Sequence, residues 1–302
     1  MSAPLVRLLE NMNQAIVGKE EAVRLVLAAL LSGGHALLED VPGVGKTLLA
    51  KSLARSVQGR FHRVQCTPDL MPGDLTGTNI WNPQEAQFEF VPGPIFANVL
   101  LADEINRSTP RTQSALLEVM EEFQVTLDRV THPVPQPFFV IATQNPIEYQ
   151  GTFVLPEAQL DRFAVALSLG YPTAEQELQM LQRAQDKRDL SQLDPCISLQ
   201  DVRSLQQATQ QVRVAPPVQK YMLNLARATR DHAGVKLGIS PRGVVTLQRT
   251  TQAIALLCGR DYALPDDVKF LAPYVLAHRM IPARGHAARD IIADLVDSLP
   301  VP

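Results

Sequence analysis

A glycine-rich segment at residues 40–47 constrains the fold of this chain more than any other feature. It reads DVPGVGKT, follows a short apolar run at 36–38 and precedes a helical apolar pattern at 48–57. A strand, a glycine-rich turn and a helix in this order are typical of a phosphate-binding loop. The backbone N–H groups of such a loop and the N-terminus of its helix surround a polyphosphate. We therefore expect a nucleotide triphosphate site here.

Lys46 and Thr47 supply the polar side chains of this loop. The Lys46 ammonium is expected to contact the β- and γ-phosphates, and the Thr47 hydroxyl to ligate Mg²⁺. Asp40 stands where the usual pattern has glycine, and Asp tolerates unusual backbone dihedrals better than most residues. The alternative is a glycine-rich turn with an incidental lysine. The residues expected to contact the nucleotide here are Asp40, Val41, Pro42, Gly43, Val44, Gly45, Lys46, Thr47 and Leu48.

Composition indicates a soluble globular protein of two domains. The chain has 302 residues, of which 46% are hydrophobic and 20% charged. A net charge of −3 gives no overall attraction to nucleic acid or anionic lipid. Cys66, Cys196 and Cys258 form no C-x-x-C pair, which favours buried thiols in a reducing compartment. We expect no membrane span and no signal sequence, hence a cytoplasmic protein.

Apolar strand patterns alternate with helical ones in the first half of the chain. Such alternation predicts a parallel sheet covered by helices on both faces. Two connections interrupt it: residues 67–96, rich in Pro and Gly and carrying Trp81, and residues 123–137, which predict a projecting hairpin. We expect both on one side of the molecule, where they bind something or are ordinary surface loops. The strands are expected at 36–38, 61–64, 99–102, 138–142 and 164–169.

Strand patterns fade after residue 172. Helical patterns replace them, several with Pro in the first turn. We therefore expect an α/β core at 1–172 followed by a smaller, all-helical domain at 173–302. Its helices are expected at 175–188, 199–210, 216–230, 241–257 and 265–278.

Two carboxylates end the strand predicted at 99–102. Ligands bind at strand ends in open α/β sheets. Asp103 is therefore expected to hold the Mg²⁺ shell, and Glu104 to polarise a water for attack on the γ-phosphate. An acidic strand end before a turn is the alternative. A simple nucleotide switch needs only the first carboxylate, so the pair favours a hydrolase.

Asn145 follows the next strand predicted by the sequence. Its amide could orient the attacking water and contact the γ-phosphate. Asn-Pro often starts a turn, and this alternative applies to Asn145 taken alone. The order of loop, acidic pair and Asn on successive strands favours the site.

The chain resembles AAA+ ATPases, and among them the MoxR family. The resemblance extends from about residue 17 to 278 and rests on five motifs in the family's order. They are Walker A at 40–47, Walker B and its flank at 101–107, sensor 1 at 142–146, the arginine-finger segment at 155–163 and sensor 2 at 240–243. It implies an AAA+ core, a P-loop sheet sandwiched by helices, followed by an all-α lid domain.

The resemblance also implies a homo-hexameric ring with ATP between neighbouring subunits. Arg162 would then reach the γ-phosphate of the next subunit, unless it is a surface arginine paired with Asp161. Arg242, otherwise a routine helix start, would couple the nucleotide to the lid, in its own subunit or in the neighbour. The resemblance also suggests Arg107 and Arg111 for contacts between subunits. It places Ile16, Val17 and Gly18 near the adenine. Core packing explains Ile16 and Val17 almost equally well.

By analogy, MoxR-like proteins are chaperones that mature or activate protein clients, often with a von Willebrand factor A domain partner. A nucleic-acid motor and a nucleotide-gated scaffold are the alternatives. The acidic balance disfavours a nucleic-acid partner, and Glu104 disfavours the scaffold. The mild basic cluster of Arg279, Arg284, His286 and Arg289 is explained by a solvated face.

Overall fold

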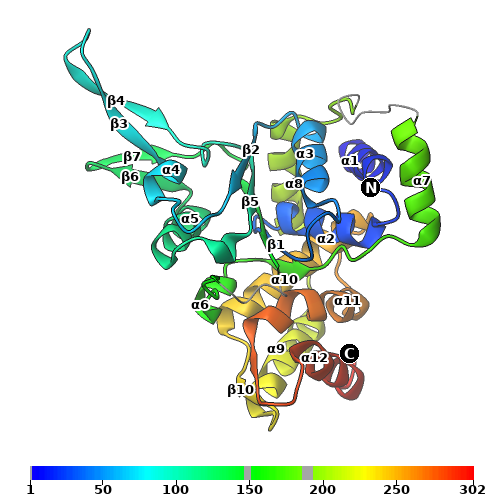
Figure 1. Cartoon of the computed structure of the whole chain (residues 1–302). Coiled ribbons are helices and arrows are strands. Elements are labelled where there is room, and N and C mark those ends of the chain that lie inside the picture. Colours follow the sequence, from blue (N-terminus) through cyan, green and yellow to red (C-terminus); the bar gives the residue numbers. More distant parts are fainter. Residues whose placement is uncertain (1, 146–150, 186–192) are drawn as a thin grey trace.

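Five parallel strands form the central sheet of the computed structural model, which describes residues 2–145, 151–185 and 193–302 (Figure 1). The strand order is β2-β5-β8-β1-β9, and the register pairs Ala36 with Ile141 and with Val165. Because the strands are parallel, all five carboxyl ends lie at the same end of the sheet. The strands are β1 (Ala36–Glu39), β2 (Phe61–Gln65), β5 (Val99–Asp103), β8 (Phe139–Gln144) and β9 (Val165–Leu167).

Helices bury both faces of this sheet, as the sequence predicted. Successive side chains of a strand point to opposite faces, so Val99 and Leu101 join one buried cluster while Leu100 and Ala102 join the other. The helices α1 (Ala3–Ala15), α2 (Glu20–Leu31) and α3 (Lys46–Ser56) contribute to the first cluster, and α5 (Pro110–Glu122) to the second. The predicted α/β class is therefore confirmed.

Two β-hairpins project from the α5 side of the sheet (Figure 1). The connection at 67–96 contains α4 (Pro72–Thr76) and the hairpin of β3 (Gly77–Asn82) and β4 (Gln87–Pro92). The hairpin predicted within 123–137 consists of β6 (Gln124–Leu127) and β7 (Val130–Pro133).

Polar and aromatic contacts join the two hairpins. The Phe90 ring stacks on His132 at 3.9 Å between ring centroids. The Asn79 side chain donates a hydrogen bond of 2.7 Å to Asp128. The prediction that both connections lie on one side is confirmed.

The C-terminal part is mainly helical. Ser198 and Ser240 cap α8 and α10, since each hydroxyl accepts a backbone N–H three residues on. A two-stranded ladder of β10 (Val235–Leu237) and β11 (Ile281–Pro282) and the last helix are additional to the predicted elements. The helices are α7 (Ala174–Gln185), α8 (Leu199–Gln211), α9 (Pro216–Asp231), α10 (Pro241–Leu257), α11 (Pro265–Leu276) and α12 (Ala288–Ser298), so residues 186–188 of the predicted 175–188 helix lie outside the described ranges.

The helical part packs directly on the core. Helices α8, α10 and α11 share the buried cluster of α1–α3. The boundary at 172 and 173 stays a prediction, because one continuous cluster spans it. Among residues 2–145, 151–185 and 193–302, no helix is long and apolar enough to cross a membrane.

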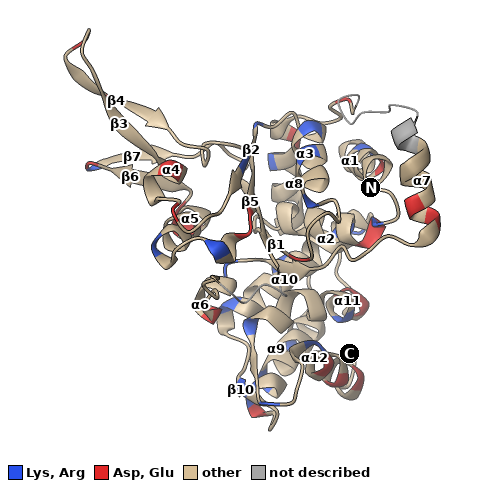
Figure 2. Ribbon diagram, viewed as in Figure 1, with Lys and Arg blue, Asp and Glu red and all other residues tan. Residues whose placement is uncertain are grey.

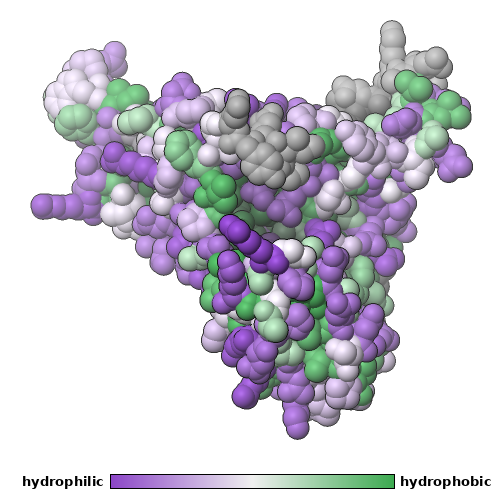
Figure 3. Space-filling view, turned by 60° about the horizontal axis from the view of Figure 1, so that its bottom comes forward, coloured by the Kyte–Doolittle hydropathy of each residue, from purple (hydrophilic) through white to green (hydrophobic). Residues whose placement is uncertain are grey.

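Charges of both signs are distributed over both parts of the ribbon (Figure 2). Several exposed apolar side chains gather on the β3–β4 hairpin and on α7, which lie at the upper corners of Figure 3. Trp81 and Phe88 are the large side chains on the hairpin, and Leu178 and Leu181 on α7.

Candidate functional site

The glycine-rich loop connects β1 to α3 and leaves open space in front of its backbone. Gly43 and Gly45 have φ of 88° and 102°, in the left-handed region that favours glycine. Among the residues that the structure describes, a Cβ at either position would meet no heavy atom within 4 Å, so none of these residues fills this space. Gly45 is the N-cap of α3, whose first N–H groups have no partner within the helix. This loop can therefore accept a phosphate chain.

The Lys46 side chain lies folded against its own loop. Its ammonium donates hydrogen bonds of 2.8 Å to the Asp40 carbonyl and 3.2 Å to the Val41 carbonyl. Thr47 and Leu48 follow it in the first turn of α3, with Thr47 half-buried. Both Lys46 contacts are to carbonyl groups of the loop, which an anion could replace as partners of the ammonium.

Asp40 has a structural reason to replace the glycine of the usual pattern. Its backbone φ is not positive, so it does not use the dihedral tolerance that the sequence suggested. Its carboxylate instead accepts hydrogen bonds from the Ser168 hydroxyl at 2.6 Å and from the backbone N–H of Leu169 at 2.7 Å and Gly170 at 3.1 Å. Asp40 thus ties the loop to the end of β9.

Asp103 and Glu104 stand at the end of β5, beside the end of β8. The Thr143 hydroxyl on β8 donates to Asp103 Oδ1 at 2.7 Å and accepts the Glu104 backbone N–H at 2.8 Å. Glu104 has φ of 58° and ψ of 51°, a left-handed conformation that costs free energy for a residue with a side chain. Thr143 thereby fixes the Asp103 carboxylate and the Glu104 backbone relative to the strand ends.

Two side chains of β2 complete this group, and the sequence analysis missed both. Arg63 forms an ion pair of 2.6 Å with Asp103 Oδ2, and Gln65 donates a hydrogen bond of 2.7 Å to Glu104 Oε2. The sequence feature that could have identified them is the alternation in β2, where these two polar residues flank buried Val64. Strand β2 pairs with β5, which ends in Asp103.

Asn145 directly follows β8 and is buried at the same end of the sheet. Arg107, a secondary candidate, pairs with Glu104 at 3.1 Å, whereas Arg111 is exposed on α5. Pro146, the last residue of the sensor 1 segment, lies outside the described residues.

The segment before α2 borders a small pocket near the end of β9. Gly18 lines it together with Leu25, Leu169 and Tyr274. Ile16 is buried in the core cluster, in agreement with the packing explanation, and Val17 is half-buried. Of the three residues suggested near the adenine, Gly18 is the one that lines this pocket.

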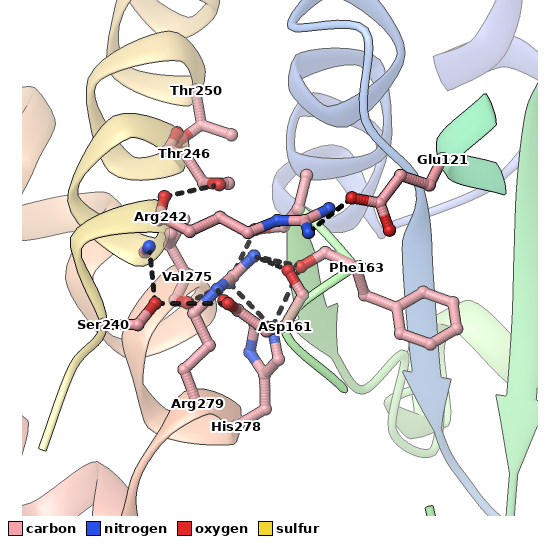
Figure 4. Close-up of polar contacts among 12 residues, drawn as sticks. Glu121, Asp161, Phe163, Ser240, Arg242, Thr246, Thr250, Val275, His278 and Arg279 are labelled. Carbon is pink, nitrogen blue, oxygen red and sulfur yellow. Dashed lines mark hydrogen bonds and ion pairs between the residues drawn. The ribbon is translucent and has the colours of Figure 1, made fainter. Parts of the chain in front are cut away.

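Arg162 and Arg242 lie at the opposite end of the sheet from the loop. Arg162 lies three residues before the start of β9, and both arginines line a pocket with Gly34 and His35, which precede β1. Glu121 at the end of α5 bridges them, since Arg162 Nε lies 3.1 Å from one carboxylate oxygen and Arg242 Nη1 2.8 Å from the other. Figure 4 shows the Arg242 side chain extended toward Glu121.

The expectation that Arg279 lies on a solvated basic face is wrong. It is buried and forms an ion pair of 2.8 Å with Asp161. Asp161 therefore pairs with Arg279, whereas its neighbour Arg162 pairs with Glu121, so the expected alternative of an Arg162–Asp161 pair is wrong. Burial and the positive charge of Arg279 lower the pKa of the adjacent His278 well below its ordinary value.

Known proteins resemble this chain over almost its full length. Residues 35–165 match the ATPase family associated with various cellular activities, and residues 227–295 match the AAA lid domain. The uncharacterized protein YeaC of Bacillus subtilis is 47% identical, with 99% of this chain and 95% of YeaC covered. Chaperone MoxR1 of Mycobacterium tuberculosis is 40% identical, with 97% of this chain and 79% of MoxR1 covered.

A further MoxR protein and a solved structure agree with this assignment. Protein MoxR of Methylorubrum extorquens is 30% identical, with 96% of this chain and 92% of the relative covered. A crystal structure of a candidate ATPase from Cytophaga hutchinsonii superposes with a TM-score of 0.92 at 37% identity, and the match covers 99% of this chain and 95% of that one. With five motifs in order on an α/β core and a helical lid, the chain belongs to the MoxR family of AAA+ ATPases.

Proposed function

We propose that this protein binds ATP and Mg²⁺ at the carboxyl ends of β1, β5 and β8 and hydrolyses the ATP within a homo-hexameric ring. Hydrolysis then drives chaperone-like remodelling of client proteins. The family membership supports the ATPase class. Arg162 and Arg242, at the other end of the sheet from the phosphate loop, support the division of each site between two subunits.

The residues at the carboxyl ends of the strands fit a magnesium–triphosphate complex. The open loop around Gly43 and Gly45 offers N–H groups to phosphate oxygens, and Lys46 exchanges its carbonyl partners for phosphate. Thr47 and Asp103 carry the oxygen ligands that Mg²⁺ prefers. When bound, Mg²⁺ neutralises charge on the phosphates. Arg63 would give up its contact with Asp103 to make room for it.

Glu104 is the proposed general base. Three contacts hold it at the strand end. Its carboxylate accepts a hydrogen bond from the Gln65 amide and forms an ion pair with Arg107, and its backbone N–H donates to Thr143. A carboxylate fixed in this way accepts the proton of the attacking water. Asn145 would orient that water, because it stands at the end of the neighbouring strand.

Arg162 and Arg242 are proposed to act on the nucleotide of the neighbouring subunit. A strand rises about 3.3 Å per residue, so the two ends of β1 are separated by on the order of 13 Å. A guanidinium at the N-terminal end cannot cross the packed sheet to its own loop. It can reach the loop of a second copy, where its positive charge stabilises the transition state of phosphoryl transfer.

The exposed β3–β4 hairpin is the proposed contact for clients. The strand register places Trp81 and Phe88, which are 51% and 68% exposed, on one face of the hairpin. Ile80 and Val91, which are 52% and 44% exposed, lie on the other face. Apolar side chains gathered at the surface are typical of protein-binding sites. A von Willebrand factor A domain protein as partner, and the cytoplasm as location, remain parts of the same proposal.

Size and turnover measured together test the proposal. Wild-type protein with ATP and Mg²⁺ should release phosphate and assemble to six times the chain mass of 33.2 kDa. Removal of Mg²⁺ with a chelator should stop phosphate release, because Asp103 and Thr47 bind the metal. A protein that stays monomeric with ATP, or releases no phosphate as a hexamer, would contradict the proposal.

A further inference from the structure

Arg279 is a buried arginine, and most of its hydrogen bonds go to the short segment at residues 161–164. Its side chain is 1% exposed. Nε donates to Asp161 Oδ1 at 2.8 Å, and Nη2 donates to the carbonyls of Asp161, at 3.2 Å, and Phe163. Nη1 donates to the carbonyls of Ala164, at 3.3 Å, and Val275. A guanidinium with this many acceptors can remain charged without water.

Apart from Val275, the residues that accept these hydrogen bonds from Arg279 flank Arg162 on both sides. Asp161 precedes it, and Phe163 and Ala164 follow it. Arg279 thus binds the backbone on both sides of Arg162. The Arg162 side chain itself extends to the surface, where it pairs with Glu121. Arg279 belongs to the lid, in the turn that follows α11. Its hydrogen bonds to residues 161–164 therefore join the lid to the core.

The second carboxylate oxygen of Asp161 connects this set of hydrogen bonds to the helix turn that carries Arg242. Asp161 Oδ2 accepts a hydrogen bond of 3.1 Å from the Ser240 hydroxyl. That hydroxyl also caps α10 by accepting the Gly243 N–H at 3.0 Å. Arg242 lies in this capped first turn, and Figure 4 shows these contacts side by side. One carboxylate therefore connects the backbone of Arg162 with the helix start of Arg242.

We propose that Arg279 is a positioning residue for the shared ATP site, because through Asp161 it holds Arg162 and Arg242 in one fixed arrangement. Both guanidinium groups then reach the neighbouring subunit's γ-phosphate together, and both move with the lid. This inference rests on the proposed function, in which those two arginines act across the subunit boundary.

A positioning role and a purely structural role make different predictions. A structural ion pair affects stability wherever it lies. A positioning residue affects turnover at the neighbour's site and leaves the subunit's own nucleotide affinity unchanged. Mixed rings separate these effects, because one subunit can supply the nucleotide site and another the arginines.

The test replaces Arg279 by Met in the full chain. We expect an unchanged Kd for ATP and a fall in kcat on the order of 10- to 100-fold, as small displacements of catalytic groups cause. Addition of Lys46→Ala subunits, which keep intact arginines, should restore part of the turnover. Subunits with both Lys46→Ala and Arg279→Met should restore none.

Arg260→Met is the matched control. Arg260 also forms a bidentate pair in the lid, to Asp267 at 2.6 and 2.8 Å, but touches none of residues 161–164. Its turnover per hexamer should stay at the wild-type value. Full turnover in folded Arg279→Met rings, or an equal loss in the Arg260 variant, would overturn the inference.

Two further variants keep the result decisive. If Arg279→Met does not fold, Asp161→Asn is measured in the same assay with the same expected rescue, and full turnover of its rings would overturn the inference. Arg162→Ala, mixed with Lys46→Ala, reports on the proposed function itself. If Lys46→Ala subunits rescue Arg162→Ala while Arg279→Met shows full turnover, the shared site is supported and only the positioning role is refuted. Full turnover in Arg162→Ala would refute the shared site.

Discussion

Lys46 is the residue whose contacts must change most when a nucleotide binds. Two loop carbonyls now accept its hydrogen bonds, and phosphate oxygens would form stronger, charge-assisted ones. We predict that Lys46→Ala weakens the binding of a non-hydrolysable ATP analogue by roughly 10- to 100-fold in calorimetry.

Lys51 provides the control for this change, because it is exposed on the same helix. Lys51→Ala should bind the analogue as wild type does. Equal affinity in the two variants would refute the role of the loop.

Glu104 should separate binding from hydrolysis. Replacement by Gln preserves the shape of the side chain and its proximity to Gln65 but removes the base. We predict unchanged ATP affinity and a fall in kcat on the order of 10² to 10⁴, measured by phosphate release. Glu118→Gln, at an exposed position of α5, is the control. Wild-type turnover in Glu104→Gln would remove this residue from catalysis.

The sequence alone identified candidate site residues where the pattern is contiguous. The glycines and Lys46 are neighbours in the chain, and Asp103 and Glu104 end an apolar run. Sequence patterns did not reveal the roles of Gln65, Thr143, Glu121 and Arg279, because their partners lie 39 to 121 positions away. Only the folded chain brings these groups together.

At the scale of elements, the β3–β4 hairpin carries the client prediction. We predict that Trp81→Ser with Phe88→Ser leaves basal ATP turnover unchanged and abolishes its stimulation by an unfolded, reduced and alkylated globular protein. The control Leu223→Ser removes an exposed apolar side chain, 44% accessible, from α9. Equal stimulation in both variants would place client contact elsewhere.

Trp81 also provides a direct signal. It is the single tryptophan of the chain and half-exposed at 51%. Burial by a Trp-free client should shift its fluorescence to shorter wavelength, whereas an unchanged spectrum at saturation would exclude this surface.

Elements with long periodic patterns were the ones that the sequence predicted. The five sheet strands, the helices α8 to α11 and the β6–β7 hairpin are confirmed. The ladder of β10 and β11 was missed because its strands have three and two residues, too few to establish a period. Within 67–96, many Pro and Gly residues concealed the β3–β4 hairpin.

At the scale of the whole molecule, buried His35 connects stability to pH. Its Nδ1 accepts the Val140 N–H at 3.0 Å, and its Nε2 lies 3.0 Å from the Met120 carbonyl. Burial lowers the pKa of His35 from 6.5 to about 4. The unfolded chain therefore binds a proton first, and the free energy of unfolding decreases as the pH falls from 6.5 toward 4.

The expected loss from His35 is about 3 kcal/mol over this interval. His35→Gln should therefore show a smaller decrease in the free energy of unfolding between pH 6.5 and 4.5, measured by urea denaturation. His286→Gln, at an exposed position, should keep the wild-type slope. An unchanged slope in His35→Gln would contradict the assigned cause.

The central claim is that each ATP site combines the loop of one subunit with the arginines of the next. Rings of Arg162→Ala keep the loop, and rings of Lys46→Ala keep the arginines. Their phosphate release, measured after the two proteins are mixed at equal concentration, tests the claim most directly. We predict that each variant alone is nearly inactive and that the mixture recovers a substantial part of wild-type turnover. A mixture no more active than the sum of its two components would contradict it.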